Sequence, residues 1–235
     1  MKIGILTGGG DCPGLNPVIR AVVRTADNQG MEVLGIQYGW KGLVEKTADK
    51  LDVRSVSGII HRGGTILGTS RTNPYKDPKN FEALRTNWKQ LGLDAVVAVG
   101  GEDTLGVAAK LYKDGFKVVG VPKTIDNDLS GTDVTFGFDT AVNIAMEAID
   151  RLHTTAESHR RIMVVEVMGR HAGWIALNSG IAGGADMILI PEVSIKMQEV
   201  LDVIRKRVER GKQFSIIVVA EGAKFDGNEV LVEKK

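Results

Sequence analysis

Short apolar segments rich in β-branched residues recur along the whole chain, and stretches with helical periodicity separate them. The apolar segments cover 2–7, 32–38, 94–100, 117–122, 161–169, 187–191 and 215–223. Continuous apolar strands that alternate with helices are typical of parallel sheets whose two faces are covered by helices. The alternation therefore predicts an α/β fold, and it constrains the chain more than any single motif does.

The stretches between the strands carry start and stop signals for helices. Asn16 and Pro17 predict a helix start, because a capping side chain precedes proline at the first helical position, and Gly30 predicts the helix end. Asp77 is the predicted cap of the next long helix. Apolar residues at helical spacing predict further helices near 104–114, 141–152, 173–183 and 195–211.

Turns with glycine or acidic residues follow the predicted strands at their carboxyl ends. They read "GGGDCPG" (8–14), "GGEDT" (100–104), "PKTIDND" (122–128), "MGRHAG" (168–173) and "AEGA" (220–223). In α/β sheets ligands bind beyond the carboxyl ends of the strands, and glycine lets the backbone come close to them. We therefore expect these turns to carry the ligand-binding residues.

Length, charge and cysteine content exclude several classes of function. The chain has 235 residues, enough for one large domain or two small ones, and we expect a division near residue 138, where a polar loop ends. A formal net charge of +1 argues against a general grip on nucleic acid. One cysteine, no long apolar run and no signal-peptide core predict a soluble, cytoplasmic protein without a membrane segment.

The turn "TGGGDCPGLNP" (7–17) joins the first strand to the predicted helix start. Backbone N–H groups and the helix dipole at such a junction favour an anion such as phosphate. The turn is not a Walker P-loop, and it lacks G-x-G-x-x-G because the sixth position from Gly8 is Pro13. It is either a phosphate-binding loop or a tight turn without a ligand, and Cys12 is predicted to be a small turn residue rather than a nucleophile.

Two turns carry acidic residues whose roles the pattern alone leaves open. Glu102 and Asp103 are adjacent, so they form a surface turn, a metal site or a device that selects a substrate. In "PKTIDND", an extended backbone would point Thr124, Asp126 and Asp128 to one side. Carboxylates on one side suit a general base beside a magnesium-linked acid, and the alternative is an Asx-rich turn.

Arginines in the turns are candidates for phosphate recognition. Arg71 lies in "GTSRTNP" and Arg170 in "MGRHAG". A guanidinium suits a pair of phosphate oxygens and neutralises charge on a transferred phosphoryl group, whereas the alternative is a solvated arginine. Arg160 and Arg161 precede a strand, and they either face a partner subunit or form a solvated basic turn.

The motifs "GGGDCPGLN", "GGEDT", "PKTIDND", "VVEVMGRHAGWIA" and "AEGA", in this order, resemble the phosphofructokinase family over essentially the whole chain. The resemblance implies two Rossmann-like, three-layer domains with mainly parallel sheets. It implies a domain for the phosphoryl donor and Mg²⁺ over 1–138 and a sugar-phosphate domain over 139–235. It also implies a glycolytic phosphotransferase that acts on the 1-hydroxyl of fructose 6-phosphate.

The resemblance also carries residue roles onto this chain. By similarity, Glu102 holds the metal, Asp126 takes the proton from the sugar hydroxyl, and Lys123 and Arg170 assist catalysis. The implied donor-binding residues are Gly10, Arg71, Asp103 and Thr104. The implied residues for fructose 6-phosphate are Thr124, Asp126, Arg161, Met168, Gly169, Arg170 and Glu221. Arg161 comes from the neighbouring subunit, so the resemblance implies a homo-oligomer, either a dimer or a tetramer.

Two positions depart from the pattern of the ATP-using bacterial members. Those proteins have glycine where this chain has Asp103, and commonly glycine where it has Lys123. A carboxylate at 103 would repel the α-phosphate region of ATP, whereas Lys123 would hold pyrophosphate and pair with Asp103. We therefore expect reversible phosphoryl transfer from pyrophosphate, and ATP is the alternative donor.

Members of the family continue beyond the point at which this chain ends, "EVLVEKK". The further segment supplies His and Arg side chains to the 6-phosphate of the sugar. We therefore expect the chain to be a fragment or a shortened relative. A third hypothesis follows, in which the chain is a catalytically incompetent domain that binds phosphates without turnover.

Overall fold

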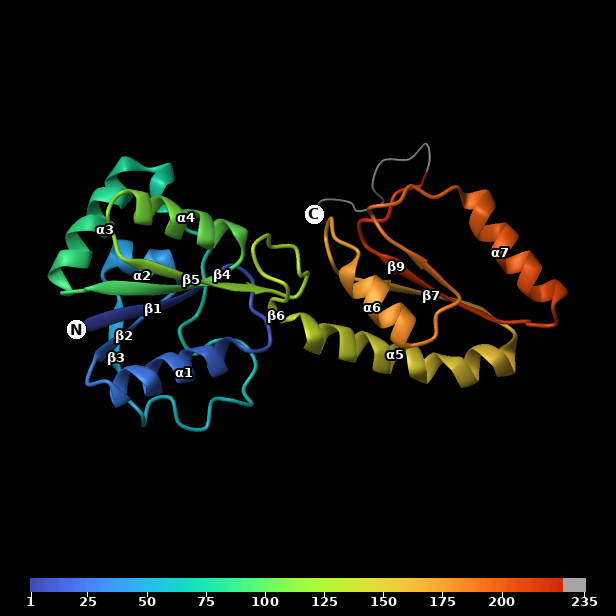
Figure 1. Cartoon of the computed structure of the whole chain (residues 1–235), viewed down its shortest axis with the longest axis horizontal. Helices are drawn as coiled ribbons and strands as arrows, with labels where there is room; N and C mark the ends of the chain where they lie inside the picture. The colour runs from blue at the N-terminus through green and yellow to red at the C-terminus, as the bar shows by residue number, and fades with distance from the viewer. Residues whose placement is uncertain (226–235) are drawn as a thin grey trace. The chain divides into compact units, whose positions relative to one another are not determined.

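The chain, shown here as a computed structural model that describes residues 1–225, forms two compact units (Figure 1). The first unit covers Met1–Thr124 and the second begins at Ile125. The sequence placed the division near residue 138, after the loop 125–135 rather than before it. The loop belongs to the second unit, and Asp126 within it forms an ion pair with Arg170 of that unit. The terminal "EVLVEKK" lies outside the described residues.

The first unit contains a mainly parallel sheet with the strand order β3-β2-β1-β4-β5. The strands are β1 (Lys2–Gly8), β2 (Glu32–Ile36), β3 (Ala48–Leu51), β4 (Ala95–Gly100) and β5 (Val118–Thr124). β1 pairs in parallel with β2 and β4, and β4 pairs in parallel with β5. Only the pairing of β3 with β2 is antiparallel among these strands. The sequence prediction of an α/β fold is confirmed.

Helices cover both faces of this sheet (Figure 1). They are α1 (Leu15–Asn28), α2 (Trp40–Glu45), α3 (Pro78–Gln90) and α4 (Glu102–Lys113), with a 3₁₀ turn η1 (Pro74–Lys76) before α3. α1 lies on one face, and α2, α3 and α4 lie on the other. Leu6, Ile36, Leu84 and Leu111 are fully buried in the apolar cluster beneath the latter group. This core positions the strand ends from which the candidate site is built.

Two predicted helix starts had different outcomes. Asp77 caps α3 as predicted, because its Oδ1 accepts a hydrogen bond from the Lys79 N–H at 2.9 Å. Asn16 does not cap α1, which begins at Leu15 after Gly14. The buried Asn16 side chain instead donates to the Arg62 carbonyl and accepts from the Ile66 N–H, both at 2.9 Å. The prediction was wrong because a tertiary contact uses the side chain that would otherwise cap the helix.

The second unit is a smaller parallel sheet with the strand order β7-β9-β8. Its elements are β6 (Phe136–Gly137), α5 (Phe138–His159), β7 (Ile162–Val167), α6 (Trp174–Ala182), β8 (Met187–Leu189), α7 (Met197–Glu209) and β9 (Ser215–Ala220). α5 and α6 share an apolar cluster with β9 through buried Ile149, Ala176 and Val218. A second cluster joins Val200 of α7 to Ile217 of β9. Since neighbouring residues of β9 enter the two clusters, helices cover both faces of the sheet.

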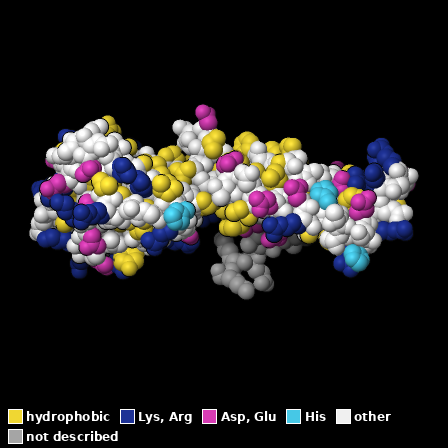
Figure 2. Space-filling view, turned by 90° about the horizontal axis from the view of Figure 1, so that it is seen from below, with side chains coloured by type: hydrophobic (Ala, Val, Ile, Leu, Met, Phe, Trp, Pro, Cys, Tyr) yellow, Lys and Arg dark blue, Asp and Glu magenta, His cyan; other side chains and the backbone are white. Residues whose placement is uncertain are grey.

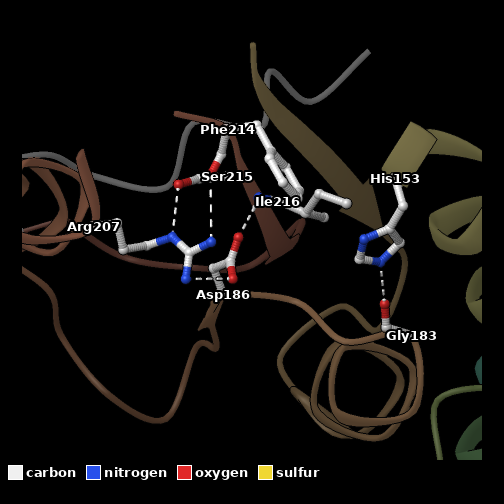
Figure 3. Close-up of polar contacts among 7 residues, drawn as sticks. All are labelled: His153, Gly183, Asp186, Arg207, Phe214, Ser215 and Ile216. Carbon is white, nitrogen blue, oxygen red and sulfur yellow. Dashed lines mark hydrogen bonds and ion pairs between the residues drawn. The ribbon is translucent and has the colours of Figure 1, made fainter. Parts of the chain in front are cut away.

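A polar network joins the end of α7 to the starts of β8 and β9 (Figure 3). The Arg207 guanidinium contacts Asp186 Oδ1 at 2.7 Å, Ser215 Oγ at 3.1 Å and the Phe214 carbonyl at 3.3 Å. Asp186 Oδ2 accepts the Ile216 N–H at 2.9 Å. The side chains of Arg207 and Asp186 are only 26% and 17% exposed, so removing one partner leaves the other poorly solvated.

We expect the substitution Arg207→Met to lower the free energy of unfolding by about 1–3 kcal/mol, because Asp186 loses its main cation while methionine keeps the apolar stem. Denaturant titration measures the loss. The matched control is Arg205→Met, which removes an exposed contact with Asp202 at 3.5 Å and should cost less than about 0.5 kcal/mol. Equal losses in the two variants would contradict the prediction.

The surface and the helices also bear on partners. On the face that Figure 2 shows, Lys and Arg side chains lie among Asp and Glu side chains on both units, as expected for a net charge of +1. Within residues 1–225, each helix is too short or too polar to cross a lipid bilayer.

Candidate active site

The carboxyl ends of β1, β4 and β5 lie level at one edge of the first sheet. The parallel register pairs Gly8 of β1 with Gly100 of β4, and Gly100 with Pro122 of β5. The turns after these strands therefore start side by side. This edge gathers the candidate donor-binding residues.

The turn between β1 and α1 presents its backbone to solvent. Gly9 and Gly14 adopt positive φ angles of 81° and 103°, which glycine tolerates best. Gly10 is exposed, and a Cβ placed there would meet no heavy atom within 4 Å. Cys12 is buried beneath the turn, and desolvation raises the pKa of its thiol to about 11 although the charge of Lys123 opposes the shift. The thiol is therefore protonated at neutral pH, as suits a turn residue.

The loop that carries Arg71 lies against this turn. The Gly9 N–H donates to the Ser70 carbonyl at 3.2 Å, and Thr7 Oγ1 donates to the Gly68 carbonyl at 2.9 Å. Arg71 is exposed, so its guanidinium is accessible to an anion. Tertiary hydrogen bonds thus bring Arg71 next to the turn of Gly10, although more than fifty residues separate them in the chain.

Glu102 and Asp103 lie in the first turn of α4. This helix begins at Glu102, two residues before the start near 104 that the sequence predicted. Both are exposed. The backbone N–H groups and the dipole at a helix N-terminus stabilise negative charge, so the helix offsets part of the repulsion between the two carboxylates. Because both side chains are exposed, they are accessible to ligands.

Thr104 lies below the surface of the same turn. It is 4% exposed, and a Cβ on Gly8 or Gly100 would come within 2.5 Å and 2.4 Å of its side chain. The Trp40 indole donates to the Thr104 carbonyl at 3.2 Å. Thr104 thus anchors the start of α4 between two glycines, and its contact with the donor stays a prediction.

Lys123, near the end of β5, reaches across to the turn after β1. Its side chain is largely buried, and Nζ donates to the Gly10 carbonyl at 2.6 Å, across 113 positions of sequence. A buried ammonium requires such partners because desolvation disfavours its charge. The contact brings a cation to the predicted donor turn, while its pairing with Asp103 stays a prediction.

The backbone after β5 differs from the extended form that the sequence suggested. The strand ends at Thr124, and Asn127 adopts a left-handed conformation with φ 53°. Asp126 is buried whereas Asp128 is exposed, so the expected alignment on one side was wrong. The Asn127 side chain accepts the N–H of Thr135, eight positions along the chain, at 2.9 Å, so a contact across the loop stabilises the turn that replaces strand alternation.

The candidate sugar-phosphate residues of the second unit lie at the carboxyl ends of β7 and β9. Glu221 Oε1 accepts the N–H groups of Gly169 and Arg170, at 3.1 Å and 2.7 Å. Arg170 Nε lies 3.8 Å from Asp126 Oδ2, and its side chain is 70% exposed. Met168 is also exposed. The structure therefore brings these residues together with the candidate base Asp126.

Arg161 lies at the opposite end of β7. It is exposed and directly precedes the strand, whereas Met168 directly follows it. A strand of 6 residues spans about 20 Å. Arg161 is therefore separated by the length of the strand from Met168, Gly169 and Arg170 of its own chain.

Sequence reasoning missed Glu192, which follows β8. Its Oε1 accepts the N–H of Gly173, the cap of α6, at 2.8 Å. The signal was present, because "ILIPE" ends a strand with an acid just as "VVAE" does at Glu221. No local rule links such an acid to a loop that precedes it in the chain.

The exposed carboxylates of the first unit suit a magnesium ion that arrives with phosphates. Residues 1–225 contain no group of three or more His, Cys, Asp or Glu side chains arranged to hold a metal. Mg²⁺ commonly keeps several waters and takes one or two protein carboxylates together with substrate phosphates. Glu102 and Asp103, next to the turn of Gly10, fit that mode of binding.

Comparison with known proteins gives one family. A family model described as phosphofructokinase matches residues 2–234. The pyrophosphate–fructose 6-phosphate 1-phosphotransferase of Amycolatopsis methanolica is 59% identical over 228 residues, which are 97% of this chain and 67% of that protein. The ATP-dependent 6-phosphofructokinase 2 of Clostridium perfringens is 56% identical, over 99% of this chain and 67% of that protein. The chain thus spans about two thirds of the length of these relatives.

A solved structure shares the same fold. Phosphofructokinase from Saccharomyces cerevisiae superposes with a TM-score of 0.87 at 35% sequence identity. The match covers 98% of this chain and 35% of the yeast chain.

Proposed function

Because the chain belongs to the phosphofructokinase family, we propose that it transfers a phosphoryl group from pyrophosphate to the 1-hydroxyl of fructose 6-phosphate. The products are fructose 1,6-bisphosphate and phosphate, and the reaction is reversible. The relatives include both pyrophosphate-dependent and ATP-dependent proteins at similar identity, so the choice of donor depends on the residues of this chain.

The observation that carries the choice of pyrophosphate is the exposed carboxylate of Asp103 in the first turn of α4, and the hydrogen bond from Lys123 to the Gly10 carbonyl at 2.6 Å supports it. The ammonium adds positive charge to a turn whose exposed backbone suits phosphate oxygens. Asp103, in the first turn of α4 on the neighbouring strand end, adds a negative charge. A nucleotide would bring its α-phosphate and ribose past that carboxylate, whereas pyrophosphate has neither.

In the proposed transfer, residues of this chain align the reactants and balance charge. Asp126 accepts the proton of the 1-hydroxyl as the new oxygen–phosphorus bond forms, and the donor phosphate leaves with the electrons of the broken bond. Arg170, 3.8 Å from Asp126, offsets negative charge on the phosphoryl group. Glu102 would hold Mg²⁺, which would supply further charge neutralisation.

We also propose a homo-oligomer in which Arg161 serves the sugar phosphate of a neighbouring subunit. Arg161 is exposed and lies about 20 Å along β7 from Met168, so it is too distant to serve the same substrate in its own chain. A dimer or tetramer that brings this end of β7 to a second copy would place the positive charge of Arg161 at the sugar phosphate of that copy.

ATP remains the second candidate donor, because the Clostridium perfringens relative with 56% identity is named as ATP-dependent. The third hypothesis is phosphate binding without turnover.

Initial rates measured with fructose 6-phosphate and Mg²⁺ separate these functions. We expect product with pyrophosphate at a kcat/KM at least about tenfold above that with ATP, equivalent to about 1.4 kcal/mol. Turnover with ATP and none with pyrophosphate would overturn the choice of donor. Pyrophosphate binding in calorimetry without product from either donor would instead favour the non-catalytic hypothesis.

A further inference from the structure

The loop between β7 and α6, residues 168–173, holds Arg170 in a backbone conformation that is unfavourable by itself. Arg170 has φ 52° and Gly169 has φ 147°. A left-handed conformation at a residue other than glycine costs about 1–3 kcal/mol and persists only where the surroundings enforce it. Because the Arg170 side chain is 70% exposed, packing does little to direct the guanidinium. The backbone conformation therefore sets the direction in which the side chain leaves the loop, and the guanidinium then lies 3.8 Å from Asp126 Oδ2.

Two carboxylates from neighbouring strand ends hold the two ends of this loop. Glu221, after β9, accepts the N–H groups of Gly169 and Arg170 through one oxygen. Glu192, after β8, accepts the N–H of Gly173 at 2.8 Å. Between them the Ala172 N–H donates to the Gly169 carbonyl at 2.8 Å, which closes the loop on itself.

Two glycines beside this loop allow neighbouring groups to approach its backbone closely. A Cβ on Gly173 would lie 2.7 Å from Glu192 Oε2, and a Cβ on Gly222 would lie 1.9 Å from the Arg170 carbonyl oxygen. The carboxylate of Glu192 thus rests directly on the start of α6, where Gly173 offers no capping side chain of its own. A negative charge at this helix N-terminus is also stabilised by the helix dipole.

We propose that Glu192 is a positioning residue, which clamps one end of the β7–α6 loop while Glu221 holds the other and so keeps Arg170 beside Asp126. The inference rests on the proposed function, in which Arg170 offsets charge on the transferred group. Glu192 touches neither reactant and acts through the backbone of the loop. Loss of Glu192 should therefore lower kcat/KM for fructose 6-phosphate and leave the affinity for the phosphoryl donor unchanged.

The test compares Glu192→Ala with Glu192→Gln, whose amide oxygen keeps an acceptor for the Gly173 N–H. The control is Glu199→Ala, which removes an acid that accepts the Lys196 N–H at the start of α7. Amide hydrogen exchange of the peptide over 168–174 is measured for each full chain. Steady-state kinetics with pyrophosphate and fructose 6-phosphate are then measured below the unfolding temperature.

We expect Glu192→Ala to speed exchange in this peptide and to lower kcat/KM for fructose 6-phosphate by about 10- to 100-fold, the scale of a small misplacement of an aligned group. Glu192→Gln should stay within about threefold of the parent chain, and Glu199→Ala should leave both readouts unchanged. Unchanged exchange in Glu192→Ala overturns the clamp. Faster exchange with unchanged kinetics overturns the positioning role. If the parent chain shows no turnover, the proposed function fails instead, and exchange alone then decides the clamp.

Discussion

The substitution Asp126→Asn is expected to lower kcat for phosphoryl transfer by about 10²- to 10⁴-fold, the usual contribution of a general base. An amide cannot take the proton of the sugar hydroxyl, yet it has nearly the same shape as the carboxylate. Asp126 is 7% exposed, so this similarity in shape keeps the buried position filled. Steady-state rates with saturating donor measure the loss, and calorimetry with fructose 6-phosphate should show a change in affinity of less than about tenfold.

The matched control for this variant is Asp133→Asn, which lies seven positions along the same loop. Asp133 is exposed, and none of the roles described above is assigned to it. The control should retain a kcat within about twofold of the parent chain, since surface substitutions rarely matter. A kcat for Asp126→Asn within tenfold of the parent value would remove Asp126 from the role of base.

The substitution Asp103→Gly is expected to reverse the preference for the phosphoryl donor. Loss of the carboxylate removes the repulsion of a nucleotide α-phosphate, so kcat/KM with ATP should rise at least about tenfold, or about 1.4 kcal/mol. The kcat/KM with pyrophosphate should fall, because Lys123 loses the carboxylate with which it is predicted to pair. Competition between the two donors in one reaction mixture measures the ratio directly.

A second variant, Asp103→Asn, separates charge from size at this position. It removes the negative charge but keeps the bulk of the side chain, so it should recover part of the gain with ATP if repulsion dominates. Asp103 is exposed in the first turn of α4, and replacement by glycine there should cost about 1 kcal/mol of stability, too little to unfold the chain. Unchanged donor preference in both variants would leave ATP and pyrophosphate undistinguished by this residue and would contradict the proposed selection.

Much of the site could be anticipated from local patterns. Apolar strands with glycine turns at their ends predicted the α/β fold, and the shared edge of β1, β4 and β5 follows from the parallel register. The cap at Asp77 was likewise predicted from a short stretch of sequence. Such features are encoded within a few residues, because helix caps, turns and side-chain alternation depend on local geometry.

Other parts required contacts between distant segments. Asn16 reads as a helix cap, but it bridges to Arg62 and Ile66. Asp126 and Asp128 read as neighbours on one side, but a left-handed residue places one inside and the other outside. In both cases the local rule was sound, and a competing interaction outside the local window prevailed.

By itself, the sequence determined the alternation of strands and helices, the turns that end the strands and the family to which the chain belongs. Only the tertiary structure decided that Lys123 bonds to Gly10 and that Glu192 and Glu221 hold the loop of Arg170. These contacts join segments between 19 and 113 residues apart. Their partners are chosen by the order and register of the strands, which emerge only when the sheets pack, and no periodicity along the chain encodes them.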